Sequence, residues 1–208
     1  MTALPHEVKW LRACRMLAPL FSTCSRRQYF AVVLAPNKRV AGIGYNGAPS
    51  GMTHCVDGGC PRSSSTVVPG SAYDSPEGFC VAQHAEAGAL LWSDPAVRRD
   101  GTLVVNGPPC LECARLIASS GIRRVVHLDD PGYTNWSAIE GFLAAAGVEV
   151  CGVTAEDVPV DDDTITVMSE SGDEVIRFAG DEARWITDTA VKQFFSRLVV
   201  EHLSGRGD

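Results

Sequence analysis

The sequence predicts an α/β protein: a three-layer sandwich in which a mixed five-stranded sheet carries helices on both faces. Two observations carry this prediction. Two short apolar runs joined by a tight turn, at residues 29–47, indicate an antiparallel hairpin. From residue 80 to residue 153, helical and strand-like segments then alternate, which is typical of crossover units with parallel strands. The alternation stops near residue 155, so the rest of the chain is expected to be an extension.

The N-terminal elements follow from hydrophobic spacing. Residues 7–21 place apolar side chains at helical intervals, and Pro19 is expected to end or kink that helix. Residues 29–35 and 40–47 are expected to be strands, with the turn at Pro36-Asn37-Lys38. Residues 48–78 are rich in Gly, Pro, Ser and Asp. So long a loop in a compact domain usually serves as a lid or a metal clip.

The alternating region supplies the other strands and helices of the sandwich. We expect a helix over 80–93, a strand over 102–106, a helix over 110–120 closed by Gly121, a strand over 123–128, a helix over 135–147 and a strand over 148–153. The first domain therefore spans residues 1–153.

Residues 154–208 form the predicted extension. An acidic linker leads to a hairpin that turns at Ser171-Gly172, and an amphipathic helix follows with Asp188 as its N-cap. That helix either packs on its own domain or forms an oligomer contact. We expect a homo-oligomer.

Composition and charge exclude several classes of protein. The chain of 208 residues is 45% hydrophobic and 21% charged, as in soluble globular proteins. It has no apolar run of membrane-spanning length and no signal-peptide core at the N-terminus, so a cytoplasmic location is expected. A net charge of -7 argues against a nucleic-acid partner. It leaves room for a small anionic ligand held by a few local cations, for which Arg26-Arg27, Lys38, Arg39 and Arg62 are the candidates. The alternative is that these charges are solvated surface.

Eight cysteines are present. In a secreted chain they could form disulfides, but a cytoplasmic chain more often uses clustered cysteines for metal binding or catalysis. Cys14 and Cys151 lie in apolar segments and are expected to be core residues.

The chemistry is carried by two short motifs. His84 and Glu86 lie at the start of one expected helix, and Cys110 and Cys113 open another. Each motif alone has an ordinary explanation: a polar helix start for the first, a redox pair for the second. Together they supply one imidazole and two thiolates, which are three of the four ligands that zinc prefers. Glu86 is then the nearest carboxylate for moving a proton at the fourth, open position.

His-x-Glu followed by Pro-Cys-x-x-Cys is the signature of zinc-dependent deaminases. The likeness extends to STCSRRQ (22–28), GIGYNGAPSGMTHC (42–55), PCLECARLI (109–117) and SGIRRVVHL (120–128). In this order the segments resemble the deoxycytidylate deaminase family over residues 7–153. GYNGAPSG separates this family from the tRNA adenosine, guanine and riboflavin-pathway deaminases. The resemblance implies a cytidine-deaminase-like fold.

The resemblance also implies a reaction: hydrolytic conversion of dCMP to dUMP and ammonia, which feeds dTMP synthesis. His84, Cys110 and Cys113 would hold zinc, and Glu86 would carry the proton to N3 and to the leaving amino group. Substrate-binding residues carried over from the family are Arg26 and Tyr133 for the 5′-phosphate, Asn46 for the sugar, and Ala85 and Pro109 beside the metal ligands.

Two further features come only from the resemblance. Some family members hold a second, structural zinc, for which Cys24, Cys55, Cys60 and Cys80 are the candidates, with His54 as a substitute for one of them. The alternative is four reduced, buried thiols. Many members are also switched on by dCTP and off by dTTP, with Mg²⁺ accompanying the effector.

Three departures from the family pattern leave the substrate open. Gly88 replaces an Asn, and Asn106-Gly107-Pro108 replaces a Thr and a large apolar residue. Tyr29-Phe30-Ala31-Val32 replaces Val-Gly-Ala-Val, and the bulk of Phe30 in place of Gly is expected to reshape the edge of the pocket. A deaminase for a modified or differently phosphorylated pyrimidine therefore stays an alternative. A zinc-stabilised nucleotide sensor is disfavoured by Glu86, which a structural site does not need. Editing of single-stranded nucleic acid is disfavoured by the acidic balance.

Overall fold

The computed structural model describes residues 2–64, 73, 78–133, 135–159, 164–168 and 174–179. Residues 1–159 form one compact unit and residues 160–208 a second. The first unit contains a five-stranded sheet in the order β2-β1-β3-β4-β5. In the part of the chain that the structure describes, no helix combines the length and the apolar character needed to cross a bilayer.

The sheet is mixed, as predicted. Strand β1 (Phe30–Leu34) lies between β2 (Val40–Tyr45) and β3 (Thr102–Val105) and runs antiparallel to both. Strands β3, β4 (Arg124–Leu128) and β5 (Glu149–Val153) run parallel. Their connections are helices, because parallel neighbours cannot be joined by a tight turn.

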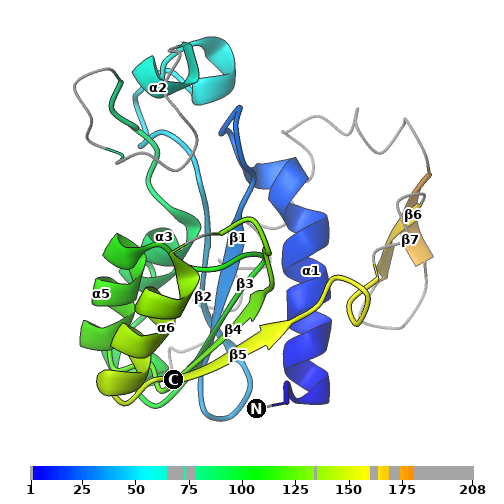
Figure 1. The fold of residues 1–208 in the computed structure, drawn as a ribbon. Helices are drawn as coiled ribbons and strands as arrows, with labels where there is room; N and C mark the ends of the chain where they lie inside the picture. The colour runs from blue at the N-terminus through cyan, green and yellow to red at the C-terminus, as the bar shows by residue number, and fades with distance from the viewer. Residues whose placement is uncertain are drawn as a thin grey trace, which may run out of the picture. The chain divides into compact units, whose positions relative to one another are not determined.

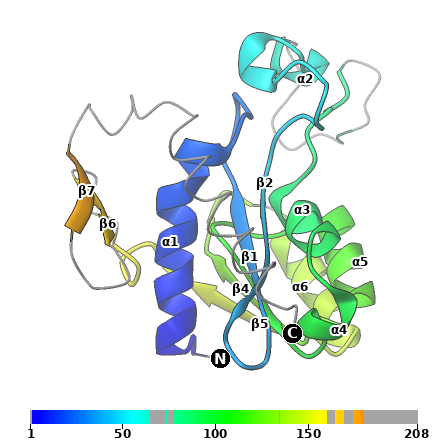
Figure 2. The same ribbon diagram turned by 180° about the vertical axis from the view of Figure 1, so that it is seen from behind.

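Helices cover both faces of the sheet, which confirms the three-layer sandwich (Figures 1 and 2). Helix α1 (Pro5–Phe21) packs on one face, against β1, β3 and β4. Helices α3 (Ala85–Leu91), α5 (Leu111–Ser119) and α6 (Trp136–Ala145) pack on the other. The long loop after β2 carries the short helices η1 (Cys55–Asp57) and α2 (Pro61–Ser64), and α4 (Pro95–Arg98) follows α3.

Helix α1 is tied to the sheet by a buried ion pair that the sequence did not reveal. Glu7 accepts a hydrogen bond from the backbone N–H of Leu4 at 2.7 Å, which caps the first turn. The same carboxylate, 1% exposed, receives Arg124 of β4 at 2.8 and 3.2 Å. Arg124 also donates to Glu149 on β5 at 3.1 Å. Each buried charge is therefore paired, as burial requires.

Two predicted helix limits differ from the structure. Helix α1 ends at Phe21, the last residue of the expected range 7–21, so of the two expectations for Pro19, an end or a kink, the end is wrong. The expected helix over 80–93 begins only at Ala85, because Gln83 pairs with Gly47 through two backbone hydrogen bonds of 2.9 and 3.2 Å. Cys80 therefore lies outside the helix, whereas the expected range 80–93 had placed it one helical turn before His84.

The C-terminal region divides slightly later than the expected boundary at residue 153. Val158 is 1% exposed, and Arg15 donates to the carbonyls of Ala155 and Val158, so residues 154–159 pack on the first unit. In the second unit, β6 (Thr164–Met168) and β7 (Glu174–Ala179) pair antiparallel, as the predicted hairpin requires. The expected turn at Ser171-Gly172 and the helix from Asp188 lie outside the described residues.

The contact between α3 and β2 depends on glycine. A Cβ at Gly44 would lie 2.2 Å from the carbonyl oxygen of Ala85 and 2.3 Å from the backbone nitrogen of Ala89. Both neighbours are backbone atoms and cannot turn away. Gly44→Ala is therefore expected to lower the free energy of unfolding by about 1–3 kcal/mol or more, measured by denaturant unfolding. Gly141→Ala, on α6 where a Cβ meets nothing within 4 Å, is the control and should be neutral or stabilising.

Candidate active site

The strand directions bring four segments to one edge of the sheet. The carboxyl ends of β3 and β4 meet there because these strands are parallel. Strand β1 is antiparallel to β3, so the segment before β1 lies at the same edge, and β2 returns its carboxyl end to it. Residues 24–29, 46–47, 106–110 and 129–133 therefore surround one site, and the start of α3 lies beside it (Figure 1).

Three potential metal ligands converge at this edge. His84 is the N-cap of α3, Cys110 is the N-cap of α5, and Cys113 lies in the first turn of α5. The Nδ1 atom of His84 lies 3.3 Å from the sulfur of Cys110 and 3.4 Å from that of Cys113. All three ligand atoms lie within 4.8 Å of one another, and this is the only such His, Cys, Asp or Glu group among the described residues.

This donor set fits zinc. With zinc–sulfur and zinc–nitrogen bonds of about 2.3 and 2.0 Å, the sulfur and nitrogen ligands of a tetrahedral ion lie about 3.5 Å apart. The two observed separations, 3.3 and 3.4 Å, agree with that value. One ring nitrogen cannot supply hydrogen bonds to satisfy both sulfurs, whereas an ion at their centre satisfies all three donors. The sequence had already combined these three residues, and the structure brings them together as expected.

The two sulfurs of the site differ in acidity, because the hydrogen bond with Cys110 and burial raise the pKa of the Cys113 thiol. The hydrogen bond from Cys113, which outweighs the opposing effect of burial, together with His84 lowers the pKa of the Cys110 thiol. Burial opposes the charged form of His84, but its hydrogen bond with Cys110 and the nearby Glu86 raise the pKa of the imidazole. Thiolate is the form that binds metal.

Glu86 lies in the first turn of α3 and is 4% exposed. Burial raises the pKa of its carboxyl group, while the charge of His84 opposes that rise. A carboxyl group with a raised pKa exchanges protons more readily near neutral pH than an ordinary glutamate does. The floor of the site therefore combines a metal-ligand cluster with a proton carrier.

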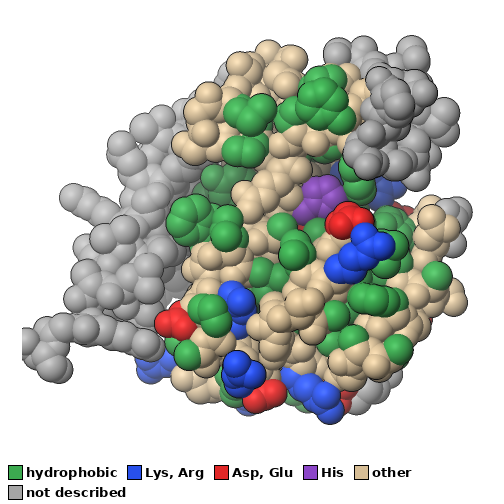
Figure 3. Space-filling model, turned by 90° about the vertical axis from the view of Figure 1, so that its left-hand side faces the viewer, with side chains coloured by type: hydrophobic (Ala, Val, Ile, Leu, Met, Phe, Trp, Pro, Cys, Tyr) green, Lys and Arg blue, Asp and Glu red, His purple; other side chains and the backbone are tan. Residues whose placement is uncertain are grey.

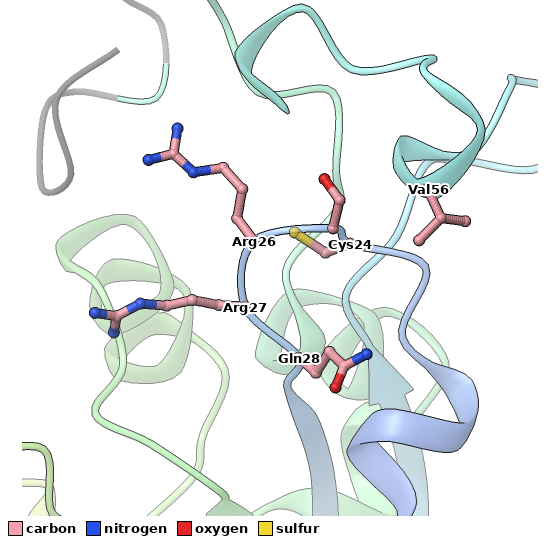
Figure 4. Close-up of a pocket in the computed structure, with 6 residues that line it drawn as sticks. Cys24, Arg26, Arg27, Gln28 and Val56 are labelled. Atoms are coloured by element: carbon pink, nitrogen blue, oxygen red, sulfur yellow. The ribbon is translucent and has the colours of Figure 1, made fainter. Parts of the chain in front are cut away.

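A cavity of about 520 Å³ opens above this floor. It is lined by the predicted residues Arg26, Asn46, His84, Ala85, Glu86, Cys110 and Tyr133. Pro109 is buried but does not line the cavity; its neighbour Pro108 does. Arg26 and Arg27 extend to the same side of their segment, whereas Gln28 turns away from them (Figure 4). The cavity therefore has an acidic floor and basic residues along its wall.

Two asparagine side chains fix the wall segment 27–30. Asn46, after β2, accepts a hydrogen bond from the N–H of Tyr29 at 2.7 Å and donates to the carbonyl of Arg27 at 2.7 Å. Asn106, after β3, accepts from the N–H of Phe30 at 2.7 Å and donates to the carbonyl of Gln28 at 3.0 Å. We call these two amides the asparagine clamp. Asn46 also accepts a hydrogen bond from the hydroxyl of Ser22, so its side-chain oxygen is used for hydrogen bonds within the protein.

Two residues that depart from the family pattern, Phe30 and Gly88, pack inside the protein and do not line the cavity. Phe30 is 2% exposed and packs edge-on against Phe21 of α1, with ring centroids 5.7 Å apart, so it does not shape the cavity edge as expected. Gly88 faces Gly44 of β2, whose Cα lies 3.4 Å from an added Cβ. Two of the three departures reach the cavity: residues 106–108 through Pro108, and residues 29–32 through Tyr29.

The structure brings the four cysteines that were expected to bind a second metal only partly together. Side-chain hydrogen bonds link Cys60 to both Cys55 and Cys80, and Cys24 lies close enough to act electrostatically on Cys55 and Cys80. Their sulfurs do not form a group as compact as the His84 cluster. The expected substitute His54 has an exposed side chain. All eight cysteines are free thiols in the structure, so no disulfide forms.

Several cavity residues were not predicted as substrate ligands. Tyr29, Arg62, Tyr73 and Asn135 line the cavity, and the Tyr73 ring lies edge-on to His84 with centroids 4.7 Å apart. The sequence had singled out Arg27 and Arg62 only as surface cations that could meet an anion. The departure of residues 29–32 from the family pattern pointed to a change at the pocket edge. That change was expected at Phe30, whereas the residue that lines the cavity is Tyr29.

Comparison with known proteins identifies the class. The model of the cytidine and deoxycytidylate deaminase zinc-binding region matches residues 5–129. The chain therefore belongs to the zinc-dependent cytidine and deoxycytidylate deaminase family, and the predicted resemblance is confirmed.

Individual relatives agree with this class. A deoxycytidylate deaminase of Mycobacterium phage D29 is 50% identical over 107 residues, which cover 51% of this chain and 81% of the phage protein. That of Schizosaccharomyces pombe is 37% identical over 135 residues, 64% of this chain but only 40% of the yeast protein. The dCMP deaminase of cyanophage S-TIM5, solved with dCMP and dUMP, shares the fold with a TM-score of 0.53 and 22% identity, covering 73% of this chain and 100% of that one.

The asparagine clamp makes a stability prediction. Asn106→Ala removes two hydrogen bonds, one part-buried and one exposed, and leaves the N–H of Phe30 without its acceptor. We expect the free energy of unfolding to fall by about 1–3 kcal/mol. The control is Asn37→Ala, which removes one hydrogen bond from Arg39 in an exposed turn and should cost well under about 1 kcal/mol. Equal losses in the two variants would argue against the clamp.

Proposed function

We propose that this protein hydrolyses dCMP to dUMP and ammonia, and that His84, Cys110 and Cys113 hold a zinc ion for the reaction. The observation that carries the proposal is the buried Glu86 beside this compact ligand cluster, at the floor of a cavity lined by arginines. The relatives named deoxycytidylate deaminase support dCMP as the substrate.

The chemistry divides between the metal and the chain. When bound, zinc supplies a Lewis acid that makes water acidic enough to act as a nucleophile near neutral pH. Glu86 takes the proton that water loses on adding to C4 of the cytosine ring and delivers it to N3. It then takes the remaining proton from the new C4 hydroxyl and transfers it to the amino group, which leaves as ammonia while the C4 carbonyl forms. The raised pKa of Glu86 suits both directions of transfer.

The cavity walls orient the nucleotide. Ala85, fully buried beside His84, leaves room for the base against the start of α3. Asn46 keeps one amide N–H that the clamp does not use, and we assign this donor to the sugar. Arg26 and Tyr133 stand at the wall where the 5′-phosphate would lie. Pro109 contributes by fixing the turn before Cys110, since it does not line the cavity.

Glu86→Gln tests the proton carrier. The amide keeps the shape of the side chain but cannot accept a proton, so dCMP turnover, followed as ammonia release, should fall by at least about 100-fold. Zinc content, measured by atomic absorption, should stay at the wild-type level, because Glu86 is not a ligand. Cys113→Ala should instead lose the ion.

The matched control is Glu112→Gln. Glu112 lies on the exposed side of α5 and pairs with Arg115, so its replacement should leave turnover unchanged. Full activity of Glu86→Gln would rule out the assigned role. A panel of dCMP, CMP, dCTP, deoxycytidine and 5-substituted dCMP defines the preferred pyrimidine.

A second, structural zinc at Cys24, Cys55, Cys60 and Cys80 is also proposed. Its support is the link of Cys60 to Cys55 and Cys80, together with the backbone hydrogen bond of 3.1 Å from Val56 to the carbonyl of Thr23, which holds the two cysteine-bearing segments together. Because the sulfurs are less compact than the catalytic cluster, binding would draw the side chains inward.

Metal stoichiometry tests this second site. The wild-type chain should hold two zinc ions, and Cys60→Ser should hold one while keeping the His84 site loaded. Cys151→Ala, at a buried cysteine of β5 far along the sheet, should keep both ions. One zinc per wild-type chain would remove the second site.

We infer a homo-oligomer, supported by the neighbouring exposed side chains Leu91 and Trp92, 66% and 77% exposed, at the end of α3. On the face in Figure 3, hydrophobic side chains lie in several groups separated mainly by other surface, with a few charged side chains between them. Control by dCTP and dTTP with Mg²⁺, and a cytoplasmic location, stay predictions from the resemblance and the sequence.

A further inference from the structure

The phenol of Tyr29 occupies an unusual place on the cavity wall. Its ring packs directly over Gly107: a Cβ on that glycine would lie 2.4 Å from Cε1 of the ring and 3.1 Å from the phenolic oxygen. The absence of a side chain at residue 107 therefore makes room for the ring. The asparagine clamp fixes the backbone of Tyr29 on both sides, so the side chain enters the cavity in a defined position.

The hydroxyl of Tyr29 is paired with Arg27 in a way that leaves a donor. Arg27 donates to the phenolic oxygen at 3.3 Å and to a carboxylate oxygen of Asp130 at 2.9 Å. Because the oxygen accepts from Arg27, the phenol's own hydrogen must point to a different acceptor. Burial raises the pKa of Tyr29, so the phenol keeps this hydrogen at neutral pH.

The depth of the cavity decides which part of a ligand meets this pair. Glu86 and Cys110, 4% and 8% exposed, form the floor, so the base must point inward to reach them. The side chain of Arg27 is 56% exposed and stands at the mouth. In a nucleotide the phosphate lies at the opposite end from the base. A guanidinium and a phenol side by side present several donors to phosphate oxygens, and hydrogen bonds to a charged group are strong.

We propose that Tyr29 is a specificity-determining residue whose hydroxyl, together with the Arg27 guanidinium, binds the 5′-phosphate of the nucleotide. This inference rests on the proposed function, and it adds these two residues to Arg26 and Tyr133. Tyr29 then favours a nucleotide over the corresponding nucleoside, and Gly107 is required because only glycine leaves space for its ring.

Tyr29→Phe tests the hydroxyl while keeping the ring over Gly107. The dissociation constants of dUMP and of 2′-deoxyuridine are measured by calorimetry on the zinc-loaded full chain. Loss of one hydrogen bond to a charged group should weaken dUMP binding roughly tenfold and leave 2′-deoxyuridine unchanged. Tyr45→Phe, on the exposed side of β2 and outside the cavity lining, is the matched control and should change neither constant.

A second pair of variants tests the steric match. Gly107→Ala should displace the ring and weaken dUMP binding at least as much as Tyr29→Phe does. Tyr29→Val removes the ring, so adding Gly107→Ala to Tyr29→Val should cause little further loss. This non-additivity is expected only if the ring and the glycine act as one unit.

The outcomes separate this inference from the proposed reaction. If the wild type deaminates dCMP but Tyr29→Phe binds dUMP as tightly as the wild type, the phosphate role is wrong and the reaction stands. If the wild type prefers dUMP in a Tyr29-dependent way but releases no ammonia from dCMP, the phosphate role stands and the reaction is wrong. Equal weakening of dUMP binding and 2′-deoxyuridine binding would also overturn the phosphate role, because the hydroxyl would then affect binding of the base and sugar as much as binding of the phosphate.

Discussion

The close packing of α3 on β2 is the constraint on which the site depends. Carbonyl and amide groups of α3 approach Gly42 and Gly44 so closely that no side chain fits between them. The helix is only seven residues long, so its first turn, which holds Glu86, follows directly from this contact. The paired backbones of Gly47 and Gln83 then fix where the helix starts. His84, one residue later, is thereby carried to the edge of the sheet where α5 begins.

A second set of constraints acts on the opposite wall. The Arg27–Phe30 segment belongs to no helix, and only its last residue belongs to a strand, so backbone hydrogen bonds of the sheet alone do not hold it. The two amides of the clamp replace them from the ends of β2 and β3. The same strands that support the core thus set the position of the cationic wall. A wall held in this way loses little conformational freedom when a ligand binds, which favours affinity.

The floor and the mouth of the cavity differ in charge. The floor gathers thiols and a carboxyl group that are shielded from water, and the mouth carries guanidinium groups that stay hydrated. A ligand that is neutral at one end and anionic at the other matches this gradient. The ion pair of Arg27 with Asp130 also joins the clamped segment to the β4–α6 loop, which carries Tyr133. It therefore links the two sides of the mouth, although at 56% and 32% exposure it adds little stability.

The sequence by itself determined the fold class, the order of elements and the reacting groups. Hydrophobic periodicity is local, and the spacing of His84, Glu86, Cys110 and Cys113 is a pattern that few other chemistries require. The tertiary structure decided the start of α3, which a backbone pairing between residues 47 and 83 delays, and the burial of Glu7 against Arg124, 117 residues away. It also decided that Tyr29, and not Phe30, faces the cavity. Neighbouring residues of an extended chain point to opposite sides, and only the packing of α1 on one face of the sheet fixes which side is which.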